Sequence, residues 1–298
     1  MCFRVATGGV RAYAGGMKIL FLGDVMGRAG RDAVEQRLPA LRLAWGLDFV
    51  VVNGENASQG AGLTAEHAKL LFAAGADCVT LGDHAFDQKD MIAYSEQDAR
   101  IIRPLNFSKV APGRGAKVFT ATQGRRVLVA QVLGQVFMKR PFDDPFSAVD
   151  AVLKTHPLGG AVQAIIVEIH AEATSEKMAM GHFCDGRATL VVGTHSHVPT
   201  ADAQILPGGT AYQTDAGACA DYDSVIGNQK DEPLRRFTTR ISGGRYKPAE
   251  GPATVCGVFI ETDPVGGLAR RIEPIRLGGR LSQTLPSLQE TTNPAGVS

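Results

Sequence analysis

The chain has 298 residues, of which 44% are hydrophobic and 20% charged, and its formal net charge at pH 7 is +1. This is the composition of a globular protein long enough to bury a sizeable core. The sequence has no basic cluster typical of nucleic-acid binding and no apolar run near the roughly 20 residues that span a bilayer. We therefore expect no membrane association and no stable nucleic-acid partner.

The cysteines are scattered through the chain, odd in number, and without C-x-x-C spacing. This pattern disfavours a disulfide framework or a thiolate zinc site, and it favours a reducing, cytoplasmic location. The five are Cys2, Cys78, Cys184, Cys219 and Cys256.

The two ends of the chain have the composition of loosely ordered segments. Residues 1–16 are rich in Gly and Ala and lack the continuous apolar core of a signal peptide. Residues 280–298 are polar, aperiodic and contain proline. We expect a disordered extension or a misassigned start at 1–16, a single domain at 17–279, and a flexible tail at 280–298.

Strands and helices alternate through the first half of the chain. Apolar strands are predicted at residues 18–23, 49–54 and 78–82. Between and after them, apolar spacing predicts helices at 30–43, 64–74 (with Thr64 as N-cap) and 88–99. This alternation predicts parallel strands joined by right-handed crossovers.

The chain from residue 117 onward is richer in strands. Residues 117–120 and 126–133 flank Gln123-Gly124 and predict a hairpin. Apolar strands are also predicted at 164–169 and 190–194, and helices at 147–153 and 175–183. Further strands, expected in a second sheet, are predicted at 211–213, 253–261 and 269–274. We therefore expect an α/β fold with two packed sheets and helices outside.

Five of the predicted strands run directly into polar residues that bind metals. A parallel sheet gathers its strand ends along one edge, where open α/β folds bind ligands, so we expect one shared site. Carboxylates, an amide and imidazoles form a mixed oxygen and nitrogen donor set, which suits Mn, Fe or Zn better than Ca. The residues are Asp24, Glu55, Asn56, Asp83, His84, His170, His195 and His197.

Each carboxylate motif also has a simpler structural interpretation. Asp24 could cap the following helix, and Asn53-Gly54 is a turn signal that would leave Glu55 solvated. Asp83 could be a capping residue and His84 a surface histidine. The recurrence at five strand ends favours the metal site over these separate explanations.

The histidines differ in how strongly they indicate a ligand. A lone histidine such as His170 is more often a hydrogen-bonded core residue. His195 and His197, two positions apart on an expected extended backbone, would share one face and are therefore a stronger signal. We interpret the remaining histidines as structural: His67, His156 and His182.

Several of these motifs together resemble those of the calcineurin-like metallophosphoesterases, and specifically the YmdB-like bacterial branch. The resemblance extends from about Met17 to about Leu277 and implies a four-layer αββα sandwich of two mixed β-sheets flanked by helices. It also implies a phosphodiesterase acting on cyclic nucleotides. It is carried by Leu22-Gly-Asp-Val-Met-Gly, Val52-Asn-Gly-Glu-Asn-Ala, Leu81-Gly-Asp-His, His170-Ala-Glu-Ala-Thr-Ser-Glu-Lys177, Gly193-Thr-His-Ser-His-Val-Pro-Thr, Gln213-Thr-Asp-Ala-Gly and Tyr222-Asp-Ser-Val-Ile-Gly227.

The resemblance further implies a role for each site residue. One metal would be surrounded by Asp24, Glu55, Asn56 and His197. Glu55 would bridge to a second metal held with Asp83, His170 and His195, and His84 matches the family's catalytic histidine. The expected cofactors are two divalent or mixed-valence ions, with iron or manganese favoured and zinc or magnesium as alternatives. The expected partner is a small phosphodiester substrate such as a 2′,3′- or 3′,5′-cyclic nucleotide, and self-association is compatible with the resemblance.

One position departs from the family pattern. The family usually has Asn where this chain has Asp83. The extra negative charge would tighten metal binding and partly offset the Lewis acidity felt by the phosphate. It could thereby change the metal preference or lower the rate, and we expect metal binding to be retained.

The expected reaction is attack on phosphorus by a metal-bridging hydroxide, with His84 donating a proton to the leaving alkoxide. Arg28 or Lys177 could meet phosphate charge, or both could be surface cations. Two alternatives stay open: a dinuclear hydrolase acting on another substrate, such as a different phosphoester or an amide, and a regulator that binds metal or cyclic nucleotide with little turnover. The loops at 137–140 and 221–228, which would shape the pocket, do not reveal the substrate.

Overall fold

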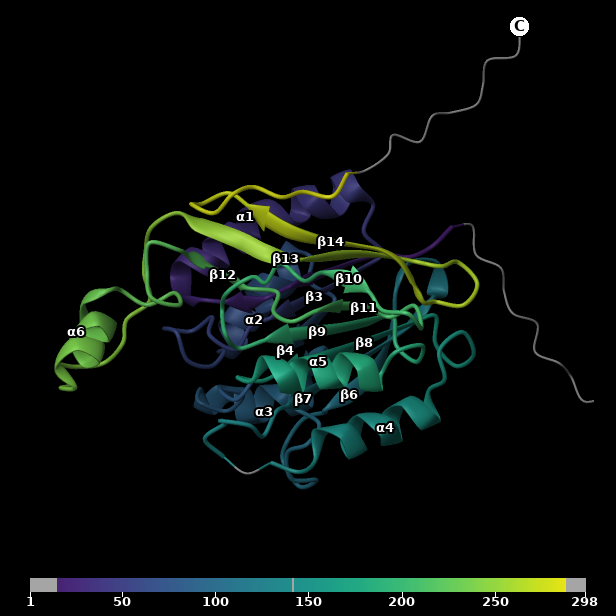
Figure 1. Cartoon of the computed structure of the whole chain (residues 1–298), viewed down its shortest axis with the longest axis horizontal. Helices are drawn as coiled ribbons and strands as arrows, with labels where there is room; N and C mark the ends of the chain where they lie inside the picture. The colour runs from purple at the N-terminus through teal and green to yellow at the C-terminus, as the bar shows by residue number, and fades with distance from the viewer. Residues whose placement is uncertain (1–14, 141, 288–298) are drawn as a thin grey trace, which may run out of the picture.

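Two β-sheets pack face to face, and helices cover their outer faces (Figure 1). The computed structural model describes residues 15–140 and 142–287. Within them the first sheet has the order β2-β12-β13-β1-β3-β4-β5, with β14 paired to β13. Its strands are β1 (Lys18–Leu22), β2 (Asp24–Val25), β3 (Phe49–Asn53), β4 (Cys78–Thr80), β5 (Ile101–Ile102), β12 (Ala218–Asp221), β13 (Ala253–Thr262) and β14 (Ala269–Leu277).

The second sheet has the order β10-β11-β9-β8-β7-β6. Like the first, it is mixed, because β7, β8, β9 and β11 run parallel while β6 and β10 are antiparallel to their neighbours. Its strands are β6 (Ala116–Thr120), β7 (Arg126–Leu133), β8 (Ala164–His170), β9 (Leu190–Thr194), β10 (Gln204–Ile205) and β11 (Ala211–Gln213).

Helices close the sandwich on both sides, which gives the expected αββα layering. The first sheet carries α1 and α2, and α3 packs beside α2; the second sheet carries α4 and α5. A further helix, α6, projects from the body at the left of Figure 1. Their bounds are α1 (Gly27–Trp45), α2 (Ala65–Ala74), α3 (Lys89–Gln97), α4 (Pro145–Thr155), α5 (Thr174–Phe183) and α6 (Asp231–Thr239).

Strand alternation explains how β1 serves two cores at once. Ile19 and Phe21 enter the core between the sheets, whereas Leu20 and Leu22 enter the core beneath α1 and α2. All four side chains are fully buried, and each such burial contributes about 1.5–3 kcal/mol. A strand buried on both faces is apolar throughout, which is why β1 is visible in the sequence.

Most predicted elements of the first half are confirmed. Strands β1, β3, β4 and β5 are parallel to one another. Helix α2 follows Thr64, whose hydroxyl accepts a hydrogen bond from the His67 amide at 3.2 Å. The β6–β7 hairpin is also present. Helix α1 is longer than predicted at both ends, and α6 was not predicted.

The assignment of strands 253–261 and 269–274 to the second sheet was wrong. Strand β13 lies antiparallel to β1 in the first sheet, with Lys18 opposite Glu261, and β14 pairs with β13. Of the three strands predicted for the second sheet, only 211–213 belongs to it. The pairing of β13 with β1 joins opposite ends of the chain, and local pattern carries no information about such a partner.

The predicted end segments fall largely outside the described residues, which exclude 1–14 and 288–298. Of the predicted tail, residues 280–287 are described, and Thr284 forms an isolated bridge with Arg276. The domain boundaries therefore stay a prediction. Over the described residues, no helix combines the length and apolarity needed to cross a membrane.

Candidate metal centre

The polar strand ends of both sheets meet at one place. Asp24, Glu55 and Asp83 follow β1, β3 and β4 of the first sheet, and His170 ends β8 of the second sheet. The convergence expected from the sequence is therefore present. The expectation that all of these residues lie at the edge of one sheet was wrong. The site is built between the carboxyl ends of two sheets, which explains how donors so far apart along the chain come together.

One cluster combines two carboxylates with two imidazoles. Ligand atoms of Glu55, Asp83, His170 and His195 all lie within 4.8 Å of one another. His170 Nε2 is 3.2 Å from Glu55 Oε2, 3.2 Å from Asp83 Oδ1 and 3.0 Å from His195 Nδ1. This is the set that the resemblance assigned to one metal.

A second cluster shares Glu55 with the first. Ligand atoms of Asp24, Glu55 and His197 also lie within 4.8 Å of one another. The amide oxygen of Asn56 is 3.1 Å from His197 Nε2. The seven expected ligands thus come together as two groups, with Glu55 common to both as a bridging carboxylate would be.

Local backbone geometry brings adjacent residues into the site. The Asn53 side-chain oxygen accepts a hydrogen bond from the Glu55 amide at 3.0 Å, and a turn follows directly. This turn lets both Glu55 and Asn56 face the centre, as expected. Gly82 is required for a different reason: a Cβ there would lie 1.9 Å from Glu55 Oε2 and 2.5 Å from His170 Nε2.

Hydrogen bonds behind the centre orient two imidazoles. His170 Nδ1 lies 2.8 Å from the Thr194 hydroxyl, which in turn donates to Glu168 Oε1 at 2.8 Å. His170 Nδ1 therefore donates to Thr194, which directs the Nε2 atom toward the cluster. His197 Nδ1 donates to the Ile226 carbonyl at 2.8 Å, which leaves its Nε2 lone pair facing Asn56.

The turn that carries His195 and His197 differs from the expected extended backbone. Strand β9 ends at Thr194, and both histidines have left-handed backbone, with φ of 93° and 65°. Because of this turn the two imidazoles do not share a face; each joins a different cluster. Left-handed backbone at a non-glycine residue costs about 1–3 kcal/mol, so other contacts must hold the turn in place.

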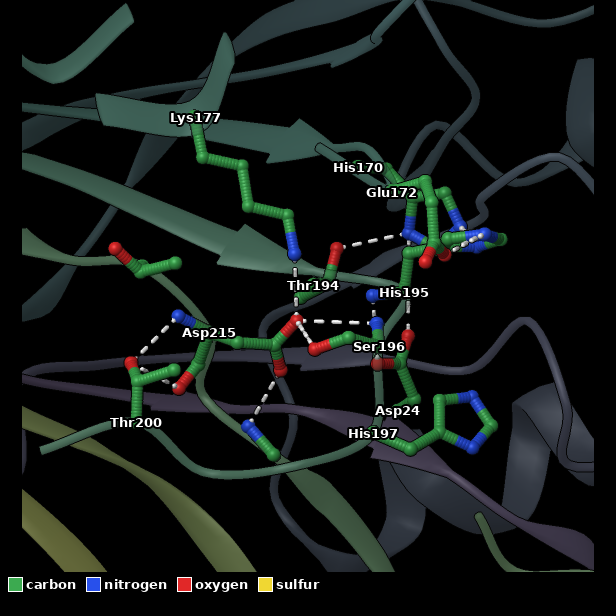
Figure 2. Close-up of polar contacts among 12 residues, drawn as sticks. Asp24, His170, Glu172, Lys177, Thr194, His195, Ser196, His197, Thr200 and Asp215 are labelled. Carbon is green, nitrogen blue, oxygen red and sulfur yellow. Dashed lines mark hydrogen bonds and ion pairs between the residues drawn. The ribbon is translucent and has the colours of Figure 1, made fainter. Parts of the chain in front are cut away.

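A buried ion pair supplies those contacts (Figure 2). Lys177 Nζ lies 2.7 Å from Asp215 Oδ2, and neither side chain is exposed. The same carboxylate oxygen accepts hydrogen bonds from the Ser196 amide at 3.1 Å and the Ser196 hydroxyl at 2.7 Å. Ser196 lies between the two histidines, so the Lys177–Asp215 pair braces the turn. The interpretation of Lys177 as a surface cation or phosphate ligand was therefore wrong.

Charges in the centre are strongly interdependent. Burial, followed by the negative charge of Glu55, raises the pKa of Asp24 well above its ordinary value. Burial alone would also raise the pKa of Asp83, but hydrogen bonds with His170 and His195 hold it far below the usual range. Burial alone would lower the pKa of His170, but Glu55 and Asp83 raise it well above normal. Several buried carboxylates thus compete for few positive groups.

The donor set fits metal ions by two observations. The fully buried Asp24 Oδ1 has no hydrogen-bond partner among the described residues. Asn56 donates its amide NH to the Gly60 carbonyl, so its oxygen and the His197 Nε2 lone pair are two acceptors facing each other at 3.1 Å. Such an arrangement is unfavourable unless a proton or a cation lies between them.

His84 lies beside the clusters rather than within them. Its Nδ1 is 2.6 Å from Asp87 Oδ2, and its ring is partly exposed. Burial alone would lower the pKa of His84, but the charge of Glu55 and the hydrogen bond with Asp87 raise it above the ordinary value. Arg28, the other expected phosphate cation, is exposed and 3.6 Å from Asp32.

The roles of several supporting residues were not foreseen. Asp87 and Glu168 orient His84 and His170, and Asp215 orients the turn through Ser196. Spacing could have found Asp87, three residues after His84 and in the same short loop. Glu168, inside an apolar strand, is the kind of buried charge that demands an explanation.

Comparison with known proteins agrees with this geometry. The chain matches the family model described as YmdB-like protein over residues 20–275. It is 40% identical over 259 residues to the 2′,3′-cyclic-nucleotide 2′-phosphodiesterase of Bacillus subtilis (strain 168), covering 87% of this chain and 96% of that protein.

Two solved structures share the fold at substantial identity. A hypothetical protein from Thermus thermophilus superposes with a TM-score of 0.82 at 41% identity, covering 89% of this chain and 100% of that one. A structure described as a novel phosphatase from Mycoplasma pneumoniae superposes with a TM-score of 0.82 at 33% identity, covering 89% of this chain and 95% of that one. The chain belongs to the YmdB-like protein family.

Proposed function

We propose that the protein is a metal-dependent phosphodiesterase that hydrolyses cyclic nucleotides, with 2′,3′-cyclic nucleotides as the first candidates. The observation that carries the proposal is the pair of donor clusters sharing Glu55. The 40% identical relative named as a 2′,3′-cyclic-nucleotide 2′-phosphodiesterase supports the substrate class. A cytoplasmic location is part of the proposal, and the four described cysteines are free and buried.

The chain's residues would hold two cations. Asp24, Glu55, Asn56 and His197 would surround one, and Glu55, Asp83, His170 and His195 the other. Imidazoles mixed with carboxylates favour Mn or Fe, with Zn and Mg as alternatives. When bound, such a pair of cations lowers the pKa of water and offsets the charge of the phosphate.

His84 would supply the proton that the leaving alkoxide needs. Because Nδ1 is bonded to Asp87, the proton leaves from Nε2. The raised pKa of His84 favours the protonated imidazole, which is the form that a general acid requires. Asp87 fixes the ring orientation and stabilises the charged form.

Substitution of His84 tests this assignment. We expect His84→Ala to retain its metal content and to lose about 10²–10⁴-fold in turnover of 2′,3′-cyclic AMP. An ester with a p-nitrophenolate leaving group should suffer a smaller loss, because that group departs without a proton. His182→Ala, an exposed histidine on α5, is the matched control. Loss of metal together with activity in His84→Ala would show that His84 is a ligand instead.

A further inference from the structure

A basic cavity of about 500 Å³ lies beside the candidate metal centre. It is formed by the start of α1, the turn after β3 and the segment that follows α6. Because its cations come from distant parts of the chain, no basic cluster is visible in the sequence. Residues lining it include Arg28, Arg31, Gln59, Arg245, Tyr246 and Lys247.

The charge of this cavity is only partly compensated from within the protein. Four cationic side chains line it against one lining carboxylate, that of Glu250, and Arg28 also lies 3.6 Å from the Asp32 carboxylate. Arg31 is held in place by donating to the Ala57 carbonyl. Among the residues that the structure describes, neither Arg245 nor Lys247 forms an ion pair, and both side chains are exposed. Like charges gathered around a cavity repel one another, and an anion would relieve that repulsion.

Two short segments of the chain each carry both a residue of the candidate metal centre and a residue that lines the cavity. Arg28 is four residues beyond Asp24, so their Cα atoms are at most about 14 Å apart. Gln59 is three residues beyond Asn56, which limits that separation to about 11 Å. A short oligonucleotide can bridge such distances.

A second connection runs through the segment after β12. The Ile226 carbonyl accepts the hydrogen bond from His197, and three residues later the Gln229 amide donates to the Lys247 carbonyl at 2.8 Å. The segment that orients one ligand imidazole therefore also holds the backbone of a residue that lines the cavity.

We propose that the basic cavity binds the sugar-phosphate backbone of a single-stranded oligoribonucleotide whose 3′-terminal cyclic phosphate lies at the metal centre. This rests on the proposed function and narrows its substrate class to RNA ends. Guanidinium groups pair with phosphates in a bidentate manner, and the arginine planes offer surfaces on which bases stack. The Tyr246 ring, which is exposed in part and has the Arg236 guanidinium over it, adds an aromatic surface. A volume of about 500 Å³ is within the usual range of ligand pockets.

Binding is tested without catalysis, using fluorescein-labelled hexaadenylate that carries a 3′-phosphate. We expect the Arg245→Ser/Lys247→Ser double variant to bind it at least about tenfold more weakly at low salt in fluorescence anisotropy. The slope of log affinity against log salt should fall by about 1.4 for two lost phosphate contacts on a single strand. The control is Arg126→Ser/Lys154→Ser, which removes two exposed positive charges from the start of β7 and from α4.

Turnover supplies a second readout. The ratio of kcat/KM for hexaadenylate 2′,3′-cyclic phosphate to kcat/KM for 2′,3′-cyclic AMP should fall about tenfold or more in the cavity variant and hold in the control. An equal effect of both double variants, or an unchanged ratio, overturns the proposal. If oligonucleotide binding depends on the cavity residues but neither substrate is hydrolysed, the proposed binding site is supported and the proposed phosphodiesterase activity is refuted. If 2′,3′-cyclic AMP is hydrolysed but the oligonucleotide does not bind, the activity is supported and the binding site is refuted.

Discussion

Replacing Lys177 with methionine isolates the brace behind the two ligand histidines. Lys177 and Asp215 are fully buried and 2.7 Å apart, and methionine has a similar length, so the change removes the charge while leaving little cavity. Asp215 would keep hydrogen bonds from Ser196 and from the Gly217 amide, but its charge would be unpaired. Breaking a buried ion pair in this way costs about 3–5 kcal/mol.

That loss is a large part of the total stability of a typical domain, about 5–15 kcal/mol, so we expect Lys177→Met to fold but to unfold far more easily. The left-handed turn at His195 and His197 would lose part of its support. If metal binding must restore the turn, each 1.4 kcal/mol of free energy that this requires weakens metal binding about tenfold. Urea unfolding measures the first effect, and metal titration of the folded protein measures the second.

Two further variants make the reasoning refutable. Lys177→Met/Asp215→Asn removes the orphaned charge, so it should recover part of the lost stability. Lys154→Met, which breaks an exposed pair with Asp150, should cost less than about 1 kcal/mol. If Lys177→Met costs no more than Lys154→Met and binds metal like the wild type, the pair does not brace the turn.

Three more substitutions probe the centre. Gly82→Ala would place a Cβ 1.9 Å from Glu55 Oε2, so metal affinity should fall at least about 10–100-fold in a titration, whereas Gly244→Ala, which meets nothing within 4 Å, should bind metal normally. Asp83→Asn removes a ligand charge and should take up less metal than the wild type at limiting supply; greater uptake would contradict the role of that charge. Asp87→Asn should lower the pKa of His84, because it removes the carboxylate that accepts a hydrogen bond from the charged imidazole. The fall in kcat at alkaline pH, where the proton donor deprotonates, should therefore move to lower pH. An alkaline fall in kcat at the same pH as in the wild type would exclude His84 as the donor.

The parts of the fold that the sequence predicts are those governed by neighbouring residues. Strand β1 is apolar on both faces, and α2 has its Thr64 cap, so both follow from local pattern. The sheet to which β13 belongs does not, because its partner β1 lies at the other end of the chain.

The site shows the same division. Polar residues at strand ends are visible in sequence, and Asp24, Glu55 and His170 indeed converge. The left-handed turn at His195 was not predictable, because it depends on Asp215 and on the buried Lys177 of helix α5. Tertiary contacts here override the extended conformation that sequence alone would favour.

Hydrolysis of 2′,3′-cyclic AMP by the protein reconstituted with Mn²⁺ or Fe²⁺ tests the central claim most directly. Metal bound per chain should be measured in the same samples, with a chelator-treated control. We expect two metals per chain and turnover that the chelator abolishes. Two bound metals without turnover would contradict the proposed reaction, and the absence of bound metal would contradict the centre itself.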